Sequence, residues 1–499
     1  MSIKKILIAN RGEISLRIMR TAKEMSIKTI AVYSEADRLS PHVQYADEAV
    51  CLGPAPSAQS YLLADKLIEV AKNLKADSIH PGYGFLSENA SFARKVREAG
   101  LVFIGPSAES METMGDKLAA RTAVAQYDVP VVPGTKEAIT DLAIAKATAR
   151  KIGYPVLIKA SAGGGGKGMR IVETEEDLEA QMSRAVSEAE SAFGDSRVFL
   201  EKYFTAPRHI EIQILGDQHG NLVHLFEREC SIQRRHQKVI EEAPSSVLTE
   251  EKRKAMGDTA LKVAKACNYY SAGTVEFIVD ENLDFYFLEI NTRLQVEHPV
   301  TEMITGKDLV REQILIAEGK PLGFVQEDLH IHGHSIEVRV YAENPKNGFL
   351  PDTGRLLTYK RPQGPGVRVD DGFEEGMDIP IYYDPLIGKL IVYDQTRAAA
   401  IERMIRAIEE FQITGVENTL GFCKFAMKHP AFRNGNFHTG FIDKHFEPEK
   451  LEDDFSQVEN DLLAALSVMI HERKNNQPST PNPFKEPTNS TKWKKNRLK

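Results

Sequence analysis

Polar side chains alternate along residues 288–300, which read LEINTRLQVEHPV. Residues two apart in an extended chain point to the same side, so an acid, an amide, a cation, an amide and an acid would share one face. Such a row could hold a metal ion, a small anion and a base that accepts a proton. The five residues are Glu289, Asn291, Arg293, Gln295 and Glu297.

The second half of this row is expected to stay extended over 292–298, because Pro299 disfavours a helical conformation at His298. The planar guanidinium of Arg293 suits a small oxyanion such as a carboxylate or bicarbonate. Glu297 beside such an anion could act as a general base. The alternative interpretation is a polar rim on a surface loop.

Glu289 also belongs to a predicted β-hairpin over 274–291. If the hairpin turns between residues 282 and 283, Glu276 lies opposite Glu289 and points to the same face. Two carboxylates about 5 Å apart repel by roughly 3 kcal/mol at an effective dielectric near 20, so a cation between them is expected. Magnesium suits these oxygen ligands, and Asn291 offers another. Two solvated acids on an exposed sheet face are the alternative.

Residues 159–170, KASAGGGGKGMR, contain a glycine-rich loop. Three of the glycines match G-x-G-x-x-G, but a dinucleotide-binding loop is followed directly by a helix, and residues 169–172 read as a strand. A Walker A loop is excluded as well, because Gly168 stands where a Ser or Thr would hold magnesium. We expect a strand–loop–strand lid whose backbone N–H groups approach a polyphosphate, with a flexible surface hairpin as the alternative.

The elements that must position these residues follow from hydrophobic periodicity. Apolar strands at 6–9, 29–33, 77–80 and 102–104 alternate with helices at 13–25 and 62–74, which predicts a parallel α/β sheet over 1–113. Helices are expected at 136–152, 175–190, 250–268 and 397–412, strands over 196–240, and mixed β structure over 334–445. The run at 230–244, CSIQRRHQKVIEEAP, taken alone reads as a basic surface loop.

Composition sets the limits on function. The 499 residues are enough for two to four domains, and a hydrophobic content of 42% supplies a core. A net charge of −8 does not suggest nucleic-acid or membrane binding. The 4 cysteines form no CxxC pair, which favours a reducing compartment, and we expect a cytoplasmic protein without a signal peptide or membrane span.

Eight ordered motifs together resemble the biotin carboxylase family, within the ATP-grasp superfamily. The motifs are IANRGEISLRIMR (8–20), HPGYGFLSEN (80–89), MGDK (114–117), KASAGGGGKGMR (159–170), RHIEIQ (208–213), QRRHQKVIEEAP (233–244), EINTRLQVEHPVTE (289–302) and YYDPLIGKLIVY (382–393). The resemblance covers roughly residues 1–447 and implies a fold class of α/β and α+β. It implies an N-terminal α/β domain (1–113), an ATP-grasp domain (114–333) with a mobile lid at about 132–203, and a mixed β/α carboxylase domain (334–446). A C-terminal helix (447–474) and a disordered tail (475–499) are expected to follow.

The resemblance also implies roles for single residues. ATP would contact Lys117, Lys159, Gly163, Gly164, Gly165, Gly166, Lys167, Gly168, Glu201, His209, Gln233, His236, Glu276 and Glu289. The ligands of magnesium or manganese, with two ions expected, would be Glu276, Glu289 and Asn291. Bicarbonate would be held by Lys238, Arg293, Gln295 and the backbone of Val296, with Glu297 as its base and Arg339 as the residue that stabilises the biotin enolate.

The chemistry implied by the family begins when bicarbonate attacks the γ-phosphate of ATP, giving carboxyphosphate and ADP. Carboxyphosphate breaks down to CO2 and phosphate, the phosphate takes the N1′ proton of biotin, and biotin captures the CO2. Residues 447–499 are too few and too polar for a biotinyl domain, so the biotin should sit on a separate carrier protein. Carboxyltransferase subunits and a second copy of the chain are the other expected partners.

Two rival functions remain at this point. Another ATP-grasp ligase, of the carbamoyl-phosphate type, would share the lid and the carboxylate hairpin but would not need Lys238, Arg293, Gln295 and Arg339 together. A non-catalytic nucleotide-binding scaffold would be expected to lack a base or a metal ligand. The final acyl acceptor is not encoded in these residues; acetyl-CoA, in fatty acid synthesis, is preferred over propionyl-CoA and pyruvate.

Overall fold

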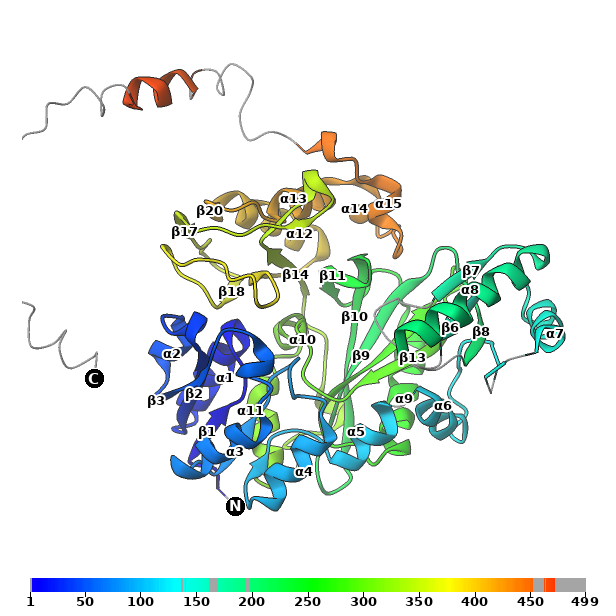
Figure 1. Ribbon diagram of the computed structural model, residues 1–499, viewed down its shortest axis with the longest axis horizontal. Coiled ribbons are helices and arrows are strands. Elements are labelled where there is room, and N and C mark those ends of the chain that lie inside the picture. The colour runs from blue at the N-terminus through cyan, green and yellow to red at the C-terminus, as the bar shows by residue number, and fades with distance from the viewer. Residues whose placement is uncertain are drawn as a thin grey trace, which may run out of the picture. The chain divides into compact units, whose positions relative to one another are not determined.

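The computed structural model describes residues 2–115, 117–135, 138–139, 141–160, 169–193, 197–451, 462 and 464–471 (Figure 1). The chain forms two compact units, Met1–Lys450 and Leu451–Lys499. Residues 464–471 of the second unit are helical, within the predicted C-terminal helix, whereas Pro448–Lys450 forms a short 3₁₀ turn. The predicted tail, 475–499, lies outside the described residues.

The first part of the chain builds a parallel sheet with the strand order β3-β2-β1-β4-β5. The strands are β1 (Lys5–Ile8), β2 (Lys28–Ser34), β3 (Glu48–Gly53), β4 (Ser78–His80) and β5 (Val102–Phe103). The helices of this region are α1 (Gly12–Glu24), α2 (Pro41–Tyr45), α3 (Ala64–Asn73), α4 (Ala90–Glu98) and α5 (Ala108–Gly115). The strand order reverses between β1 and β4, and such a reversal forms a ligand crevice at the carboxyl ends of the strands.

The largest sheet is antiparallel, in the order β13-β12-β9-β10-β11-β14-β19-β18. Its strands are β9 (Arg208–Gly216), β10 (Leu222–Arg234), β11 (Gln237–Ala243), β12 (Ser271–Val279), β13 (Phe285–Asn291), β14 (His334–Tyr341), β18 (Val367–Asp371) and β19 (Leu386–Asp394). Because β11 pairs with β14, the sheet runs across the expected domain boundary between 333 and 334. The division into domains stays a prediction.

Helices pack on this sheet, and two short ribbons lie in the same part of the chain. The helices are α9 (Glu250–Ala266), α10 (His298–Thr305), α11 (Leu309–Ala317), α12 (Arg397–Glu410), α13 (Leu420–Lys428), α14 (Pro430–Arg433) and α15 (Phe441–His445). The ribbons pair β15 (Glu343–Asn344) with β16 (Leu350–Pro351), and β17 (Thr358–Lys360) with β20 (Gln412–Thr414). The predicted fold class, a parallel α/β sheet followed by an α+β body, is confirmed.

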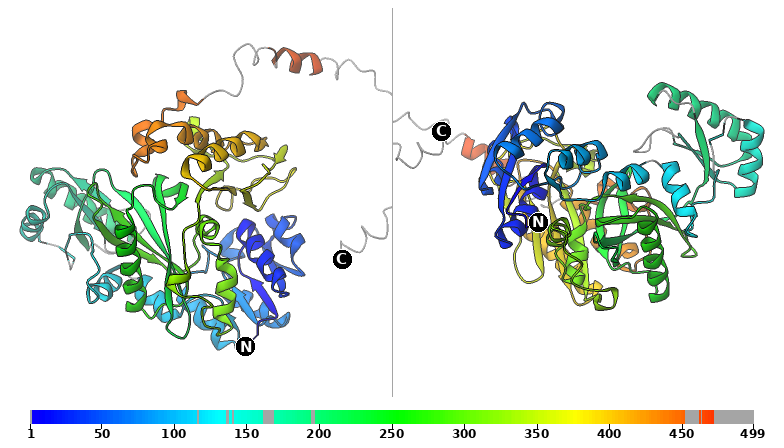
Figure 2. Two further views of the ribbon diagram at one scale, coloured as in Figure 1. Left: turned by 180° about the vertical axis from the view of Figure 1, so that it is seen from behind. Right: turned by 90° about the horizontal axis from the view of Figure 1, so that it is seen from below.

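A third sheet, with the order β7-β6-β8, forms a lobe with two helices that is set off from the other sheets in both views of Figure 2. It contains β6 (Val156–Ala160), β7 (Met169–Val172), β8 (Val198–Lys202), α7 (Leu142–Ile152) and α8 (Glu175–Phe193), and α6 (Lys117–Ala125) precedes it in the chain. Because β6 and β7 are antiparallel neighbours, the glycine-rich segment joins two strands, as predicted. The helix predicted from 136 begins only at Leu142, since the Asp141 side chain caps it by accepting from the Ala143 and Ile144 N–H groups.

Candidate active site

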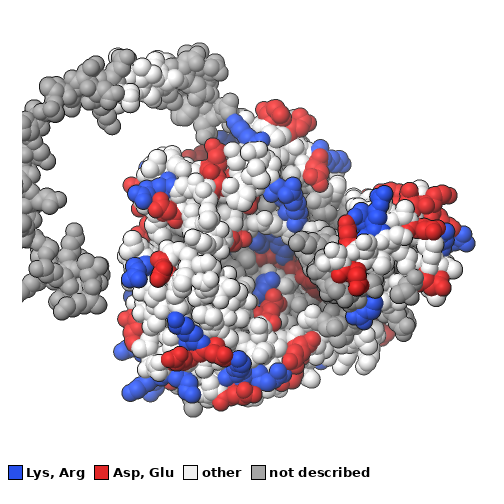
Figure 3. Space-filling view, viewed as in Figure 1, with Lys and Arg blue, Asp and Glu red and all other residues white. Residues whose placement is uncertain are grey.

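A cavity of about 2050 Å³ lies where the parallel sheet, the antiparallel sheet and the lobe of β6–β8 meet. Figure 3 shows this hollow, with Lys, Arg, Asp and Glu side chains gathered inside it. Thirteen of the predicted site residues line it: Lys159, Glu201, His209, Gln233, His236, Lys238, Glu276, Glu289, Asn291, Arg293, Gln295, Val296 and Arg339. The loops after β1 and β4 contribute Asn10, Arg11 and Tyr83, as expected at the reversal of strand order.

Some predicted residues are not placed in the cavity. Lys117 begins α6, but its side chain is not described. The glycines from Gly163 to Gly168, with Lys167, lie outside the described residues. Glu297 is described and fully buried, so it lies behind the cavity wall and not on its surface.

Three carboxylates lie side by side across β9, β12 and β13. Glu276 pairs with Glu211 on one side and with Glu289 on the other, which confirms the predicted register of the hairpin. The register shifts between Glu276 and Phe277, because Phe277 pairs with Phe287 and leaves Leu288 as an extra residue. The pairing that starts at the turn is therefore interrupted by a bulge at Leu288, and this bulge brings Glu289 opposite Glu276.

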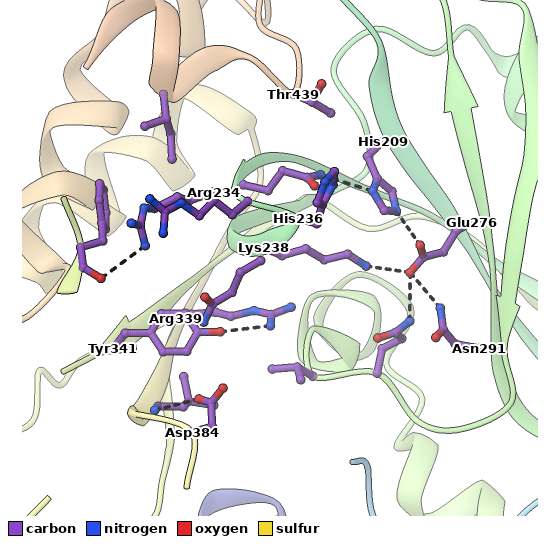
Figure 4. Close-up of a pocket in the computed structure, with 18 of the residues that line it drawn as sticks. His209, Arg234, His236, Lys238, Glu276, Asn291, Arg339, Tyr341, Asp384 and Thr439 are labelled. Carbon is purple, nitrogen blue, oxygen red and sulfur yellow. Dashed lines mark hydrogen bonds and ion pairs between the residues drawn. The ribbon is translucent and has the colours of Figure 1, made fainter. Parts of the chain in front are cut away.

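Lys238 neutralises much of this negative charge. Its Nζ donates to Glu276 Oε1 at 3.0 Å (Figure 4). It also donates to Glu211 Oε2 at 2.5 Å and to Glu297 Oε1 at 2.7 Å. Burial by itself would raise the pKa of Glu276, but Lys238 and His209 together hold that pKa well below its ordinary value. Glu276 is thus an ionised carboxylate at neutral pH and is available to a cation.

Lys238 reaches this position because residues 230–244 form two strands and not the basic surface loop that the isolated run suggests. Gln233 pairs with Lys238 across β10 and β11, and the two strands are joined by Arg235 and His236. These two residues have positive φ angles, 48° and 68°, as a two-residue type I′ hairpin turn requires. Non-glycine residues in this conformation are strained, and such strain is frequent at functional sites.

His209 lies next to both the acids and the amides. Its Nε2 is 3.0 Å from Glu276 Oε2, and its Nδ1 is 3.3 Å from the Gln233 amide nitrogen. Burial lowers the pKa of His209, but the Glu276 carboxylate outweighs burial and the pKa is raised above its ordinary value.

Glu297 is held by two cations. Lys238 donates to one oxygen, and Arg339 Nη2 donates to the other at 3.1 Å. Although burial would raise the pKa of Glu297, Lys238 and Arg339 lower it well below its ordinary value. The carboxylate is therefore ionised, but it gains basicity only when these cations are shared with another anion.

Arg339 contacts a second pair of buried acids. Its Nε donates to Glu241 Oε1 at 2.6 Å, and Glu241 lies opposite Glu337 on the neighbouring strand. Burial raises the pKa of Glu241 to about 7 and that of Glu337 well above its ordinary value. Two facing carboxyls of this kind hold a proton near neutral pH.

The row that begins at Glu289 bends after Asn291. Strand β13 ends there, and α10 begins at His298, so the prediction of an extended chain over 292–298 is wrong. Pro299 lies in the first helical turn, where the N–H that proline lacks would have no helical partner. Arg293 still donates to Gln295 Oε1 at 2.8 Å and to Asn291 Oδ1 at 3.0 Å, so the predicted polar groups remain together.

Lys159 and Glu201 are neighbours on β6 and β8 of the separate lobe. Their side chains form an ion pair, and both residues line the cavity. The contact with ATP that the resemblance implied for both residues stays a prediction, and the glycine-rich residues 161–168 lie outside the described part of the chain.

Sequence reasoning missed three acids of this site. Glu211 bonds Lys238 and also accepts from Arg228 Nε at 2.6 Å, Glu88 pairs with Arg293 Nε at 3.0 Å, and Glu241 pairs with Arg339. Glu211 had a detectable signal, because RHIEIQ places polar residues at 209, 211 and 213 with the alternation used for 289–297. Glu88 and Glu241 join partners that are far away in the sequence.

The donor set fits a hard divalent cation. Glu276 and Glu289 are paired on adjacent strands, and Asn291 follows Glu289 on the same face. Asn291 Nδ2 donates to Glu276 Oε1 at 2.9 Å, so the amide oxygen and the carboxylates lie within one small region. Carboxylate and amide oxygens are the ligands that magnesium and manganese prefer.

Comparison with protein families covers nearly all of the first unit. Residues 2–111 match "Biotin carboxylase, N-terminal domain", residues 116–325 match "Carbamoyl-phosphate synthase L chain, ATP binding domain", and residues 337–444 match "Biotin carboxylase C-terminal domain". The three matches follow one another in the order that the resemblance implied.

Curated relatives are about half identical to this chain over the residues that align. A biotin carboxylase of Halalkalibacterium halodurans is 51% identical, over 89% of this chain and 98% of the relative. One of the pyruvate carboxylase subunits of Methanothermobacter thermautotrophicus is 52% identical, over 88% and 90%. The alpha chain of the mitochondrial methylcrotonoyl-CoA carboxylase of Dictyostelium discoideum is 51% identical, over 94% of this chain and 67% of the relative.

Solved structures agree. A biotin carboxylase from Campylobacter jejuni, in a complex described as β-γ-ATP, has a TM-score of 0.85 and 49% identity, over 89% of this chain and 99% of that one. The biotin carboxylase domain dimer of Hydrogenobacter thermophilus 2-oxoglutarate carboxylase, with MgADP and bicarbonate, has a TM-score of 0.85 and 47% identity, over 91% and 100%. The chain therefore belongs to the biotin carboxylase family of ATP-grasp ligases.

Proposed function

We propose that this chain carboxylates biotin on a separate carrier protein, using ATP and bicarbonate, as the first half-reaction of a multi-subunit carboxylase. The observation that carries the proposal is the convergence of Lys238 and Arg339 on Glu297, next to the paired acids Glu276 and Glu289. A nucleotide ligase without biotin would not need a second buried cation beside the base.

The polyphosphate end of ATP would lie between the Lys159–Glu201 pair and the carboxylate row, with His209, Gln233 and His236 beside it. Glu276, Glu289 and Asn291 would hold magnesium or manganese, which would neutralise charge that develops on the transferred phosphoryl group. The relative from Hydrogenobacter thermophilus that contains MgADP and bicarbonate supports this arrangement.

Bicarbonate would occupy the space bordered by Lys238, Arg293, Gln295 and Val296. An anion there competes with Glu297 for Lys238 and Arg339, which relieves the ion pairs that depress the pKa of Glu297. Binding of the substrate would thus make the carboxylate a better base at the moment that a proton must leave bicarbonate. Arg339, on the far side of Glu297, would then stabilise the biotin enolate.

We propose acetyl-CoA as the final acceptor, with propionyl-CoA and pyruvate as the alternatives. The relatives named above are parts of pyruvate, methylcrotonoyl-CoA and 2-oxoglutarate carboxylases. Enzymes with different acceptors therefore use similar biotin carboxylase parts. A homodimer in the cytoplasm, working with a biotin carrier and carboxyltransferase subunits, completes the proposal. None of the described helices is long and apolar enough to cross a membrane.

Release of ADP by the purified chain tests the function directly. With ATP and magnesium, we expect release to require bicarbonate and to rise when free biotin or a biotinylated carrier is added. ADP release that needs bicarbonate but does not rise with free biotin or with a biotinylated carrier would favour another ATP-grasp ligase. No release under any of these conditions would favour a nucleotide-binding scaffold.

A further inference from the structure

Lys389 is a fully buried lysine at the centre of β19. It lies opposite Arg339 on β14 and opposite Asp370 on β18, on the face of the sheet that carries the charged residues. Its Nζ donates to the Val296 carbonyl oxygen at 2.8 Å and lies 3.1 Å from Glu13 Oε1. The lysine therefore joins the loop before α10 to the first turn of α1.

Glu13 is itself buried and is held from two sides. The Tyr83 hydroxyl, in the loop after β4, donates to Glu13 Oε1, and Lys389 supplies the opposite charge. Burial raises the pKa of Glu13, and Lys389 is the largest influence that lowers it. The close approach of α1 depends on Gly372, because a Cβ there would lie 2.7 Å from the Glu13 nitrogen.

Two consecutive carbonyl groups of the loop are fixed in this way. His298 Nδ1 lies 2.8 Å from the Gln295 carbonyl oxygen, and Lys389 binds the next one, that of Val296. In a planar trans peptide the N–H points opposite to the C=O, so the N–H groups of Val296 and Glu297 point away from His298 and Lys389. His298 and Lys389 are fully buried, whereas Gln295 and Val296 border the cavity.

Burying an ammonium group to bind one carbonyl oxygen costs desolvation free energy. A buried charge costs free energy unless it is paired, and an uncharged pair of the same volume would often be as stable. What the charge adds is a short, directed hydrogen bond that resists rotation of the peptide. The peptide that Lys389 holds joins Val296 to Glu297, and both residues belong to the proposed bicarbonate site.

We propose that Lys389, supported by Glu13, is a positioning residue that fixes the turn at 295–297 so that its N–H groups and Glu297 meet bicarbonate in the correct orientation. The inference rests on the proposed function of the same site. Lys389 touches no substrate; it acts through the Val296 carbonyl. It also makes the bicarbonate site depend on the contacts of Lys389 of β19 with Glu13 of α1 and with Val296 of the loop, three residues that lie far apart in the sequence.

The test removes the pair without leaving an isolated buried charge. In the double variant Lys389→Met/Glu13→Gln, we expect the apparent KM for bicarbonate in ADP release to rise about 10- to 100-fold. The KM for ATP should stay within about twofold. The matched control is Arg253→Met/Glu227→Gln, which neutralises another ion pair, 2.9 Å long, whose residues do not line the cavity. A control that lowers the thermal midpoint equally but leaves the bicarbonate KM unchanged would separate positioning from stability.

Hydrogen exchange of the loop amides gives a readout that needs no activity. In the Lys389→Met/Glu13→Gln variant, the Val296 and Glu297 amides should exchange faster than in the wild type, and in the control they should not. Unchanged exchange, or a bicarbonate KM no different from the control, would overturn the positioning role. If the wild-type chain shows no bicarbonate-dependent ADP release, the proposed function fails, and the exchange rates still decide whether Lys389 orders the turn.

Discussion

The two faces of β14 are built from opposite kinds of residues. One face carries Ile336, Val338 and Val340 of β14, which are fully buried in a core cluster with Met404 of α12. The other face carries Glu337, Arg339 and Lys389, which are also buried but lie toward α10 and α1. Alternation along β14 separates the two sets, and Lys389 of β19 pairs with Arg339 on the charged side.

The contrast separates stability from chemistry within one pair of strands. Burial of apolar surface stabilises the folded state by about 25 cal/mol per Å², so the α12 face contributes free energy of folding. Buried charges roughly repay their desolvation when they are well paired, so the other face contributes little. Its charges are arranged instead around Glu297, where position and electrostatic field determine reactivity.

The largest effect on activity is expected from the Glu297→Gln substitution on the charged side. We expect bicarbonate-dependent ADP release to fall by about 10²- to 10⁴-fold, because the amide cannot accept the proton. Binding of ADP, followed by calorimetry, should be retained. Glu227→Gln, which alters another fully buried and arginine-paired glutamate, is the control and should keep its turnover. Undiminished turnover in Glu297→Gln would refute its assignment as the base.

Met404→Ala makes the opposite change on the apolar side. Met404 is fully buried in the cluster, so its truncation should lower the free energy of unfolding by about 2–5 kcal/mol. Urea titration measures this loss. The KM values for ATP and bicarbonate should not change at urea concentrations well below the unfolding midpoint. A raised bicarbonate KM in this variant would show that the two faces are coupled and would blur the distinction.

A smaller effect should appear in the pH dependence of stability. Burial raises the pKa of Glu241 from 4.5 to about 7, so its contribution to stability is complete below pH 4.5 and is lost as the pH rises through 7. Glu241→Gln is neutral at every pH. We therefore expect the wild type to lose stability relative to this variant between pH 4.5 and 7. A difference in unfolding midpoint that stays constant over this range would contradict the raised pKa.

Local patterns in the sequence predicted part of this site, because alternation along a strand can be read from a short stretch of residues. Of the five residues in the row, Glu289, Asn291, Arg293 and Gln295 line the cavity, and the register of Glu276 opposite Glu289 is confirmed. The roles of these residues stay predictions. The path of the chain was predicted less well, since a helix begins at His298, within the segment that was expected to be extended. The bulge at Leu288 was not visible either, because its signal lies in the pairing of two strands and not in one of them.

The supporting residues could not be found from local patterns. Glu13, Tyr83 and Lys389 come from three distant segments, and each alone reads as an ordinary surface or loop residue. Only the packing of α1 on the segment after β18 brings them together, and that packing depends on the absence of a side chain at Gly372. Spacing within a sequence window carries no information about such contacts.

The pairing of β11 with β14 has a consequence for how the molecule is made. Until β14 leaves the ribosome, β11 is an edge strand whose Ile240 has no cover and whose peptide groups have no partner on that side. A fragment that starts at residue 334 has the converse defect, because Ile336 and Val338 then lie on an unpaired edge. The boundary between the second and third family matches, near residue 330, thus does not separate two independent sheets. Proteolysis or truncation there would yield two pieces that are both prone to aggregate.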